Sequence, residues 1–167
     1  RQGRIRFDAL QEGWVAEETF LNGAGEPVVG PDGWSTVRYS YDDAGQRVEE
    51  VFFDAKGGKS WAAGGHHRAR LEYANGDAKR LINEDHDPAR FSFYRFISEP
   101  TMDDEGRLRK TVTRYEDKDG RPVPGPHGGT GLVTELDEDA RITLMIHTGC
   151  NIEQTGARMT DREALAL

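Results

Sequence analysis

Hydrophobic and polar residues alternate along much of the chain. In the segment 37–41, Val37, Tyr39 and Tyr41 fall on one side of an extended strand, and Arg38 and Ser40 fall on the other. The segment 69–73 alternates in the same way. A period of two with one polar face is typical of half-buried antiparallel strands. We therefore predict an all-β fold of tandem antiparallel β-hairpins that form a long twisted or curled sheet.

A first turn motif separates the alternating segments. It consists of an aromatic residue or leucine, then Asn or Asp two positions later, Gly at the fifth and Pro at the seventh. Its copies start at Phe20, Phe52, Leu81 and Tyr115, with Lys59 in place of Pro in the second and His86 in place of Gly in the third. Asn and Asp cap tight turns and Gly accepts a positive φ, so each copy predicts a turn between strands.

A second, related turn motif places Asp or Asn before a glycine. Its copies start at Tyr41, Tyr73, Met102 and Leu136, each 21 residues after a copy of the first motif, and Ala140 replaces the last glycine. The constant spacing predicts a β-repeat domain over residues 1–149, with a half copy at 7–19 and copies starting near 20, 52, 81 and 115. For residues 150–167 we expect a tail or a short helix, because residues 160–163 form a capping box.

The two motifs together resemble a class of degenerate tandem β-hairpin repeats in bacterial proteins. Residues 41–57 contain an aromatic-Asp-x-x-Gly turn, a short strand and a Phe-Asp-x-x-Gly turn. This pattern is similar to WG-type, YD-type and MORN-like repeats, and the resemblance covers about residues 7–145. It implies an extracellular, envelope-associated or accessory module beside another domain, and it implies no catalytic residue.

Composition narrows the classes of partner. The net charge of −8 disfavours binding to a nucleic-acid backbone, so we expect no nucleic-acid partner. No apolar run approaches the roughly 18 residues that a membrane span requires. The single cysteine, Cys150, excludes an internal disulfide framework. The sequence starts with Arg1 rather than Met, and we expect it to be a piece of a longer chain.

Four segments that follow the first turn motif fall at corresponding positions of the repeat, at 30–34, 61–67, 91–96 and 125–129. Variable segments of repeat proteins often gather on one binding face. We therefore predict a binding surface made of aromatic and histidine side chains, namely Trp34, Trp61, His66, His67, Phe93, Tyr94 and His127. The alternative is that these segments only turn the chain and that their aromatic residues fill the core.

Other chemistry has weaker support. Residues of zinc-ligand type are present without the spacing of a zinc motif, namely His66, His67, His127, His147 and Cys150. Acidic residues suited to calcium cluster in the turns, where turn formation explains them more simply: Asp42, Asp43, Asp54, Asp103, Asp104, Asp117 and Asp119. His147 and Cys150 are three residues apart, but a buried thiol is a simpler interpretation than a nucleophile. We predict no metal and no cofactor.

The leading hypothesis is a non-catalytic binding or scaffold module of a larger bacterial protein that engages a protein partner or a neighbouring domain. One alternative is a module that binds carbohydrate or a cell surface through exposed Trp and Tyr side chains. Another is a metal-dependent hydrolase that uses the histidines. The sequence itself does not determine the compartment, and only the resemblance favours the cell envelope or the extracellular space.

Overall fold

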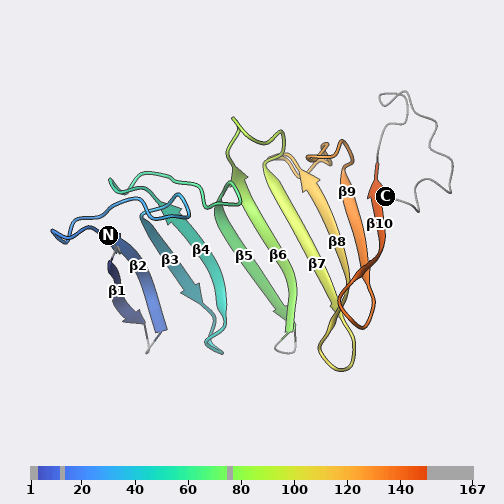
Figure 1. Ribbon diagram of the computed structural model, residues 1–167, viewed down its shortest axis with the longest axis horizontal. Coiled ribbons are helices and arrows are strands. Elements are labelled where there is room, and N and C mark those ends of the chain that lie inside the picture. The colour runs from blue at the N-terminus through green and yellow to red at the C-terminus, as the bar shows by residue number, and fades with distance from the viewer. Residues whose placement is uncertain (1–3, 12–13, 75–76, 150–167) are drawn as a thin grey trace. The chain divides into compact units, whose positions relative to one another are not determined.

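The computed structural model describes residues 4–11, 14–74 and 77–149, which form antiparallel strands joined by turns and loops (Figure 1). The strands are β1 (Arg4–Gln11), β2 (Trp14–Leu21), β3 (Thr36–Tyr41), β4 (Arg47–Phe53), β5 (His66–Ala74), β6 (Asp77–His86), β7 (Arg95–Met102), β8 (Leu108–Glu116), β9 (Gly131–Leu136) and β10 (Ile142–Thr148). Their order in the sheet is their order in the chain. The predicted all-β class of antiparallel hairpins is confirmed, and the predicted tail or helix at 150–167 lies outside the described residues.

The chain divides into two compact units. Unit 1 comprises Arg1–Glu72 and Asn83–Arg90, and unit 2 comprises Tyr73–Ile82 and Phe91–Leu167. In unit 1, β1 to β5 pair antiparallel with their sequence neighbours. In unit 2, β7 to β10 pair in the same way. Short connections favour such pairing of consecutive strands.

Three long loops share one pattern of hydrogen bonds. Each begins with a turn in which the Oδ1 atom of Asn22, Asp54 or Asp117 accepts hydrogen bonds from the backbone N–H groups of the residues two and four positions later. Each continues with a second turn, in which the N–H of Gly30, Ala62 or Gly125 donates to the carbonyl four positions later. Pro27, Lys59 and Pro122 occupy equivalent isolated bridges between the two turns. These loops therefore have the same construction in three copies, two in unit 1 and one in unit 2.

The short turns at the other end of the strands also follow the motif. The Oδ1 atoms of Asp42, Asp103 and Asp137 each accept two backbone N–H groups. The fourth turn residue has a positive φ in all three turns, with 77° at Gly45, 76° at Gly106 and 59° at Ala140. The corresponding turn at 75–76 lies outside the described residues.

The third copy differs from the expectation. The motif placed a turn at Asn83, but Asn83 lies inside β6, and the turn is formed by Asp87 to Arg90. Leu81 is only partly buried. The buried face of β6 is the opposite one, on which Glu84 and His86 are 7% and 6% exposed. Residues 87–94 contain no glycine, so this copy lacks the glycine-rich second turn of the other three.

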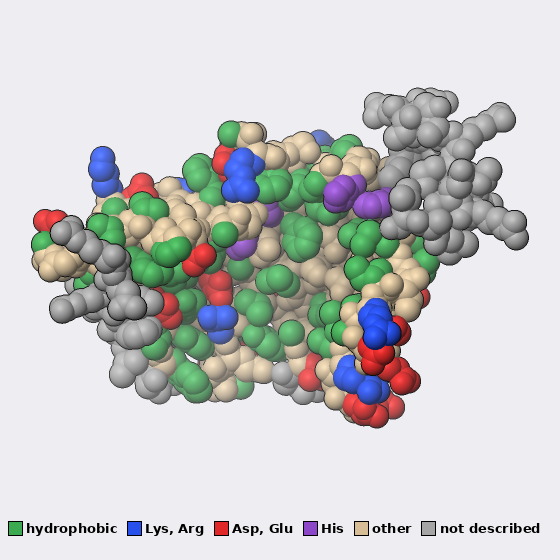
Figure 2. Space-filling model, in the orientation of Figure 1, with side chains coloured by type: hydrophobic (Ala, Val, Ile, Leu, Met, Phe, Trp, Pro, Cys, Tyr) green, Lys and Arg blue, Asp and Glu red, His purple; other side chains and the backbone are tan. Residues whose placement is uncertain are grey.

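Each unit has its own set of buried side chains. In unit 1, Val37, Phe52 and Ala69 are among the buried hydrophobic residues, and in unit 2 Phe93 and Tyr115 are among them. Hydrophobic side chains are visible below the loops on the face shown in Figure 2. In the part of the chain that is described, no helix has the length and hydrophobicity needed to cross a lipid bilayer.

Candidate functional site

Trp34 and His66, two of the predicted binding residues, lie in a row of rings in unit 1. The ring of Trp34 lies 4.7 Å from that of Phe20 and 5.9 Å from that of Phe52, measured between centroids. His66 continues the row at 5.5 Å from Phe52 and 6.0 Å from His86. Burial, and then the neighbouring His86, lower the pKa of His66 to about 4. Both residues therefore make the contacts of interior side chains.

Trp61 and His67 lie elsewhere in unit 1 and have polar partners. The indole Nε1–H of Trp61 donates to the carbonyl of Asp85 at 3.1 Å, and the ammonium of Lys59 lies 5.1 Å from the centre of the indole. Lys59 also forms an ion pair with the carboxylate of Asp85. The backbone of Asp85 has a positive φ of 58°. His67 lies 3.0 Å from the Ser60 carbonyl through Nδ1. These contacts hold the loop before β5 in place.

Phe93, Tyr94 and His127 belong to unit 2. Phe93 is 6% exposed and packs on Phe91 and Tyr115, so it offers little surface to a ligand. Tyr94 donates its backbone N–H to Glu116, and Lys118 lies over its ring at 5.9 Å. His127 contacts His147, with ring centroids 5.2 Å apart. The predicted residues thus fall into several separate groups within the two units.

Four of the seven acidic turn residues have backbone partners that account for their presence. In the turns at Asp42, Asp54, Asp103 and Asp117 an aspartate oxygen accepts two N–H groups of its own turn. Arg107 and Arg109 further engage the other oxygen of Asp103. Within the described ranges, no group of three or more His, Cys, Asp or Glu side chains is arranged to hold a metal ion. Cys150 lies outside those ranges.

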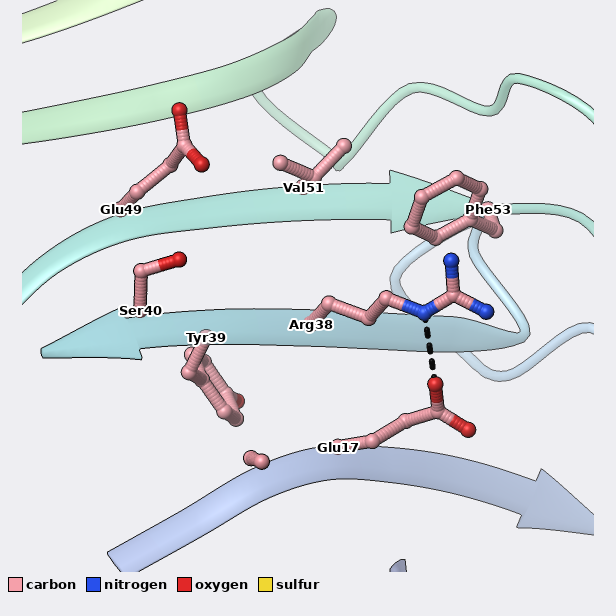
Figure 3. A pocket seen from close by; sticks show the side chains of 8 residues that line it. Glu17, Arg38, Tyr39, Ser40, Glu49, Val51 and Phe53 are labelled. Carbon is pink, nitrogen blue, oxygen red and sulfur yellow. Dashed lines mark hydrogen bonds and ion pairs between the residues drawn. The ribbon is translucent and has the colours of Figure 1, made fainter. Parts of the chain in front are cut away.

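A groove on unit 1 is the candidate site. It crosses β2, β3 and β4 and has a volume of about 470 Å³ (Figure 3). Its lining consists of Ala16, Glu17, Arg38, Tyr39, Ser40, Glu49, Val51 and Phe53. In Figure 3 the side chain of Arg38 extends between those of Glu17 and Phe53. The groove has a hydrophobic floor beside charged groups.

Strand register brings the charged residues of this surface together. Glu17 pairs with Arg38, Arg38 with Val51, and Val51 with Arg68, so these four residues form a row across β2 to β5. Residues that pair directly across antiparallel strands share a face of the sheet. We name this surface the arginine face and define it by Glu17, Arg38, Glu49, Val51, Phe53, Arg68, Arg70 and Glu84.

The arginines of this face are more exposed than their acidic partners. The side chain of Arg38 is 61% exposed and that of Glu17 is 24% exposed, with 2.7 Å between Nε and Oε2. Arg70 is 43% exposed and holds Glu84, which is 9% exposed, through two hydrogen bonds of 3.0 and 2.8 Å. The guanidinium of Arg38 also lies 4.5 Å from the centre of the Phe53 ring. The outer layer therefore presents guanidinium groups above more deeply placed carboxylates.

Tyr39 lies at the junction of β2 and β3. Burial, then the carboxylates of Glu18 and Glu50, raise the pKa of Tyr39 well above its usual range, and the hydroxyl is hydrogen-bonded to Glu18. The phenol therefore stays neutral near pH 7 and acts as a hydrogen-bond donor. This half-buried tyrosine lines the groove and links β3 to β2 through its hydrogen bond with Glu18.

Sequence reasoning missed the groove. The alternation assigned Arg38 and Ser40 to the polar face of their strand, and that face contains the groove. A signal was present in β4, where Val51 and Phe53 make the polar side hydrophobic at two alternate positions while Phe52 serves the core. Comparison with protein-family models and with curated proteins gives no match for this chain.

Proposed function

We propose that the chain is a non-catalytic protein-binding module of a larger bacterial protein, and that its partner docks on the arginine face of unit 1. The exposure of Arg38, Arg68 and Arg70 around Val51 supports this proposal. Their side chains are 61%, 46% and 43% exposed although the chain has a net charge of −8. Protein interfaces are enriched in arginine and aromatic residues around an apolar centre.

The chemistry of this face favours an acidic protein segment as the partner. Guanidinium groups bind carboxylates through paired hydrogen bonds and also stack on planar groups. The groove adds Val51, beside the Phe53 ring that Arg38 covers, as an apolar position for a side chain of the partner. A segment with one hydrophobic residue flanked by acidic residues matches both features.

The carbohydrate alternative has less support from these contacts. Sugar binding needs an accessible aromatic face on which the ring can stack. Arg38 covers Phe53, while Trp34 packs between Phe20 and Phe52. The hydrolase alternative would need a set of metal ligands, and the described residues contain no group of three that could provide it.

Site-specific photo-crosslinking in the intact protein tests the proposal. A photoreactive amino acid at Ser40, which is exposed and lines the groove, should give a discrete protein adduct. The same group at Asp43, an exposed turn residue outside the groove, should not. An adduct at both positions, or at neither, would contradict docking on this face.

Charge reversal provides the matched comparison. The double variant Arg68→Glu, Arg70→Glu should reduce the adduct at Ser40 by about tenfold or more, since interface arginines often contribute over 1.4 kcal/mol each. Lys56→Glu makes the same kind of change in an exposed turn and should leave the adduct intact. If a glycan library rather than a protein competes for the groove, the carbohydrate alternative replaces the proposal.

A further inference from the structure

His127 and His147 in unit 2 form a pair of imidazoles held by ordered backbone. His127 lies in the second turn of the loop before β9, where Gly125 N–H donates to Gly129 at 2.8 Å. His147 lies in β10 and pairs with Leu132 of β9. Their ring centroids are 5.2 Å apart and the ring planes meet at 62°. Main-chain hydrogen bonds therefore fix the backbone on either side of the pair.

Both imidazoles are accessible. His127 and His147 are exposed, and histidine side chains reach the surface near the ends of β9 and β10 in Figure 2. Within the described part of the chain, neither ring forms a hydrogen bond or an ion pair with another residue. Their ring nitrogens are thus available to a ligand from solvent.

The spacing suits a shared metal ion. A zinc–nitrogen bond is about 2.0 Å, so the centre of each ligating ring lies about 3 Å from the ion, and a tetrahedral angle puts two such centres about 5 Å apart. The observed 5.2 Å agrees with this value. The other histidine pair, His66 and His86 in unit 1, has a spacing of 6.0 Å, and His86 is 6% exposed in the core.

We propose that His127 and His147 form a two-imidazole binding site for a divalent transition-metal ion of the class that prefers nitrogen ligands, such as Zn²⁺, Ni²⁺ or Cu²⁺. Imidazole suits these ions, whereas Mg²⁺ and Ca²⁺ prefer oxygen ligands. Structural zinc sites use four protein ligands. With two, the ion keeps water in its remaining positions, so the site is exchangeable and open to a further ligand.

Titration of the untagged protein with each ion, followed by calorimetry, tests the site. We expect one ion bound per chain, tightest for Cu²⁺ in accordance with the Irving–Williams order, and no heat with Mg²⁺. His127→Gln or His147→Gln should each weaken binding by about tenfold or more, since even lesser changes around a metal site cost tenfold. His67→Gln serves as a control and should bind as the wild type does.

Spectroscopy separates a specific site from loss of folding or from adventitious binding. Electron paramagnetic resonance of the Cu²⁺ complex should show coupling to two imidazole nitrogens in the wild type and to one in either single variant. The titrations are repeated with Cys150→Ser, which should bind as tightly as the wild type if imidazoles alone form the site. Unchanged affinity in both histidine variants, or loss of binding in Cys150→Ser, would overturn the proposal.

Discussion

Ala140 and Gly106 occupy the same position of equivalent turns, and both have a left-handed backbone, with φ values of 59° and 76°. The turns begin at Asp137 and Asp103, whose side chains accept N–H groups from the same two positions. Only glycine adopts this conformation at little cost, and other residues pay about 1 kcal/mol. The turn before β10 therefore keeps the geometry of the glycine-containing turns although alanine occupies the left-handed position.

Ala140→Gly should accordingly stabilise unit 2 by about 1 kcal/mol, because it removes the cost of the left-handed alanine. Gly106→Ala should have the opposite effect of about 1 kcal/mol, since a methyl group there meets no atom within 4 Å and only the backbone conformation is affected. Urea unfolding followed by far-UV circular dichroism measures both. Equal stability of wild type and Ala140→Gly would show that the turn does not hold alanine in a strained conformation.

The turn side chains act as acceptors rather than as charges. Oδ1 of Asp54 accepts the N–H groups of Lys56 and Gly58, both at 2.8 Å, and the amide oxygen of Asn22 does the same for Ala24 and Glu26. Asp54→Ala should therefore destabilise unit 1 by about 1–2 kcal/mol, through loss of two hydrogen bonds. Asp54→Asn should be nearly neutral. Trp14, Trp34 and Trp61 all lie in unit 1, so tryptophan fluorescence during urea unfolding reports on this unit alone.

Calcium provides a further check on this turn. If Asp54 were a calcium ligand, Asp54→Asn would lower a calcium-dependent rise in the unfolding midpoint. We expect no such rise in the wild type, because the Oδ1 atom is already engaged by its own backbone.

Local chemistry explains how much of the fold could be predicted. The turns at Asn22, Asp54 and Asp117 depend only on residues within five positions, so their motif identified them correctly. The third copy offers Asn83, Asp85 and Asp87 as turn residues within a few positions, and local pattern cannot select among them. In the structure, Lys59 and Trp61 bind Asp85 from another loop, and the turn forms at Asp87.

The candidate groove depends on pairings across the sheet. Glu17 and Arg38 are 21 residues apart in sequence, and Val51 meets Arg68 from the next strand. Alternation predicts that Arg38 lies on the polar face of its strand, but it does not predict which residues of the neighbouring strands share that face. For the same reason, alternation did not predict that Trp34 and His66, both half-buried, would line up with Phe20 and Phe52 of neighbouring strands in one row of rings.

Gly30 lies directly over the aromatic ring of Phe20. A Cβ atom at this position would overlap Cδ2 and Cε2 of that ring. Gly30→Ala should therefore destabilise unit 1 by about 1–3 kcal/mol through overpacking. Gly23→Ala, at a site where a methyl group meets no atom within 4 Å, should change stability by less than about 0.5 kcal/mol.

The second copy of the loop shows that alanine can occupy the position equivalent to Gly30. Ala62 occupies the position of Gly30 there and makes the same backbone hydrogen bond, to His66. If the first loop can shift as far as the second does, Gly30→Ala will be as stable as the wild type by tryptophan fluorescence. That result would show that unit 1 does not need the backbone at position 30 to lie so close to the Phe20 ring.

His66 makes the stability of unit 1 depend on pH. Its pKa is about 4 in the folded protein, lowered first by burial and then by His86, against about 6.5 in the unfolded chain. Between these values the unfolded state binds more protons, so the stabilising contribution is complete above pH 6.5 and is lost as the pH falls toward 4. The ring is partly accessible to solvent, so we expect a loss of roughly 1–2 kcal/mol between pH 7 and 4.5.

The variant His66→Phe isolates this effect. Nδ1 of His66 is buried without a hydrogen-bond partner, so phenylalanine keeps the ring contact with Phe52 and sacrifices no bond through that atom. Fluorescence-monitored urea unfolding at pH 7, 5.5 and 4.5 should show a flatter pH dependence in His66→Phe than in the wild type. His147→Gln, an exposed histidine of unit 2, should retain the wild-type slope. A wild-type slope in His66→Phe would mean that carboxylates, and not this imidazole, control the acid sensitivity of unit 1.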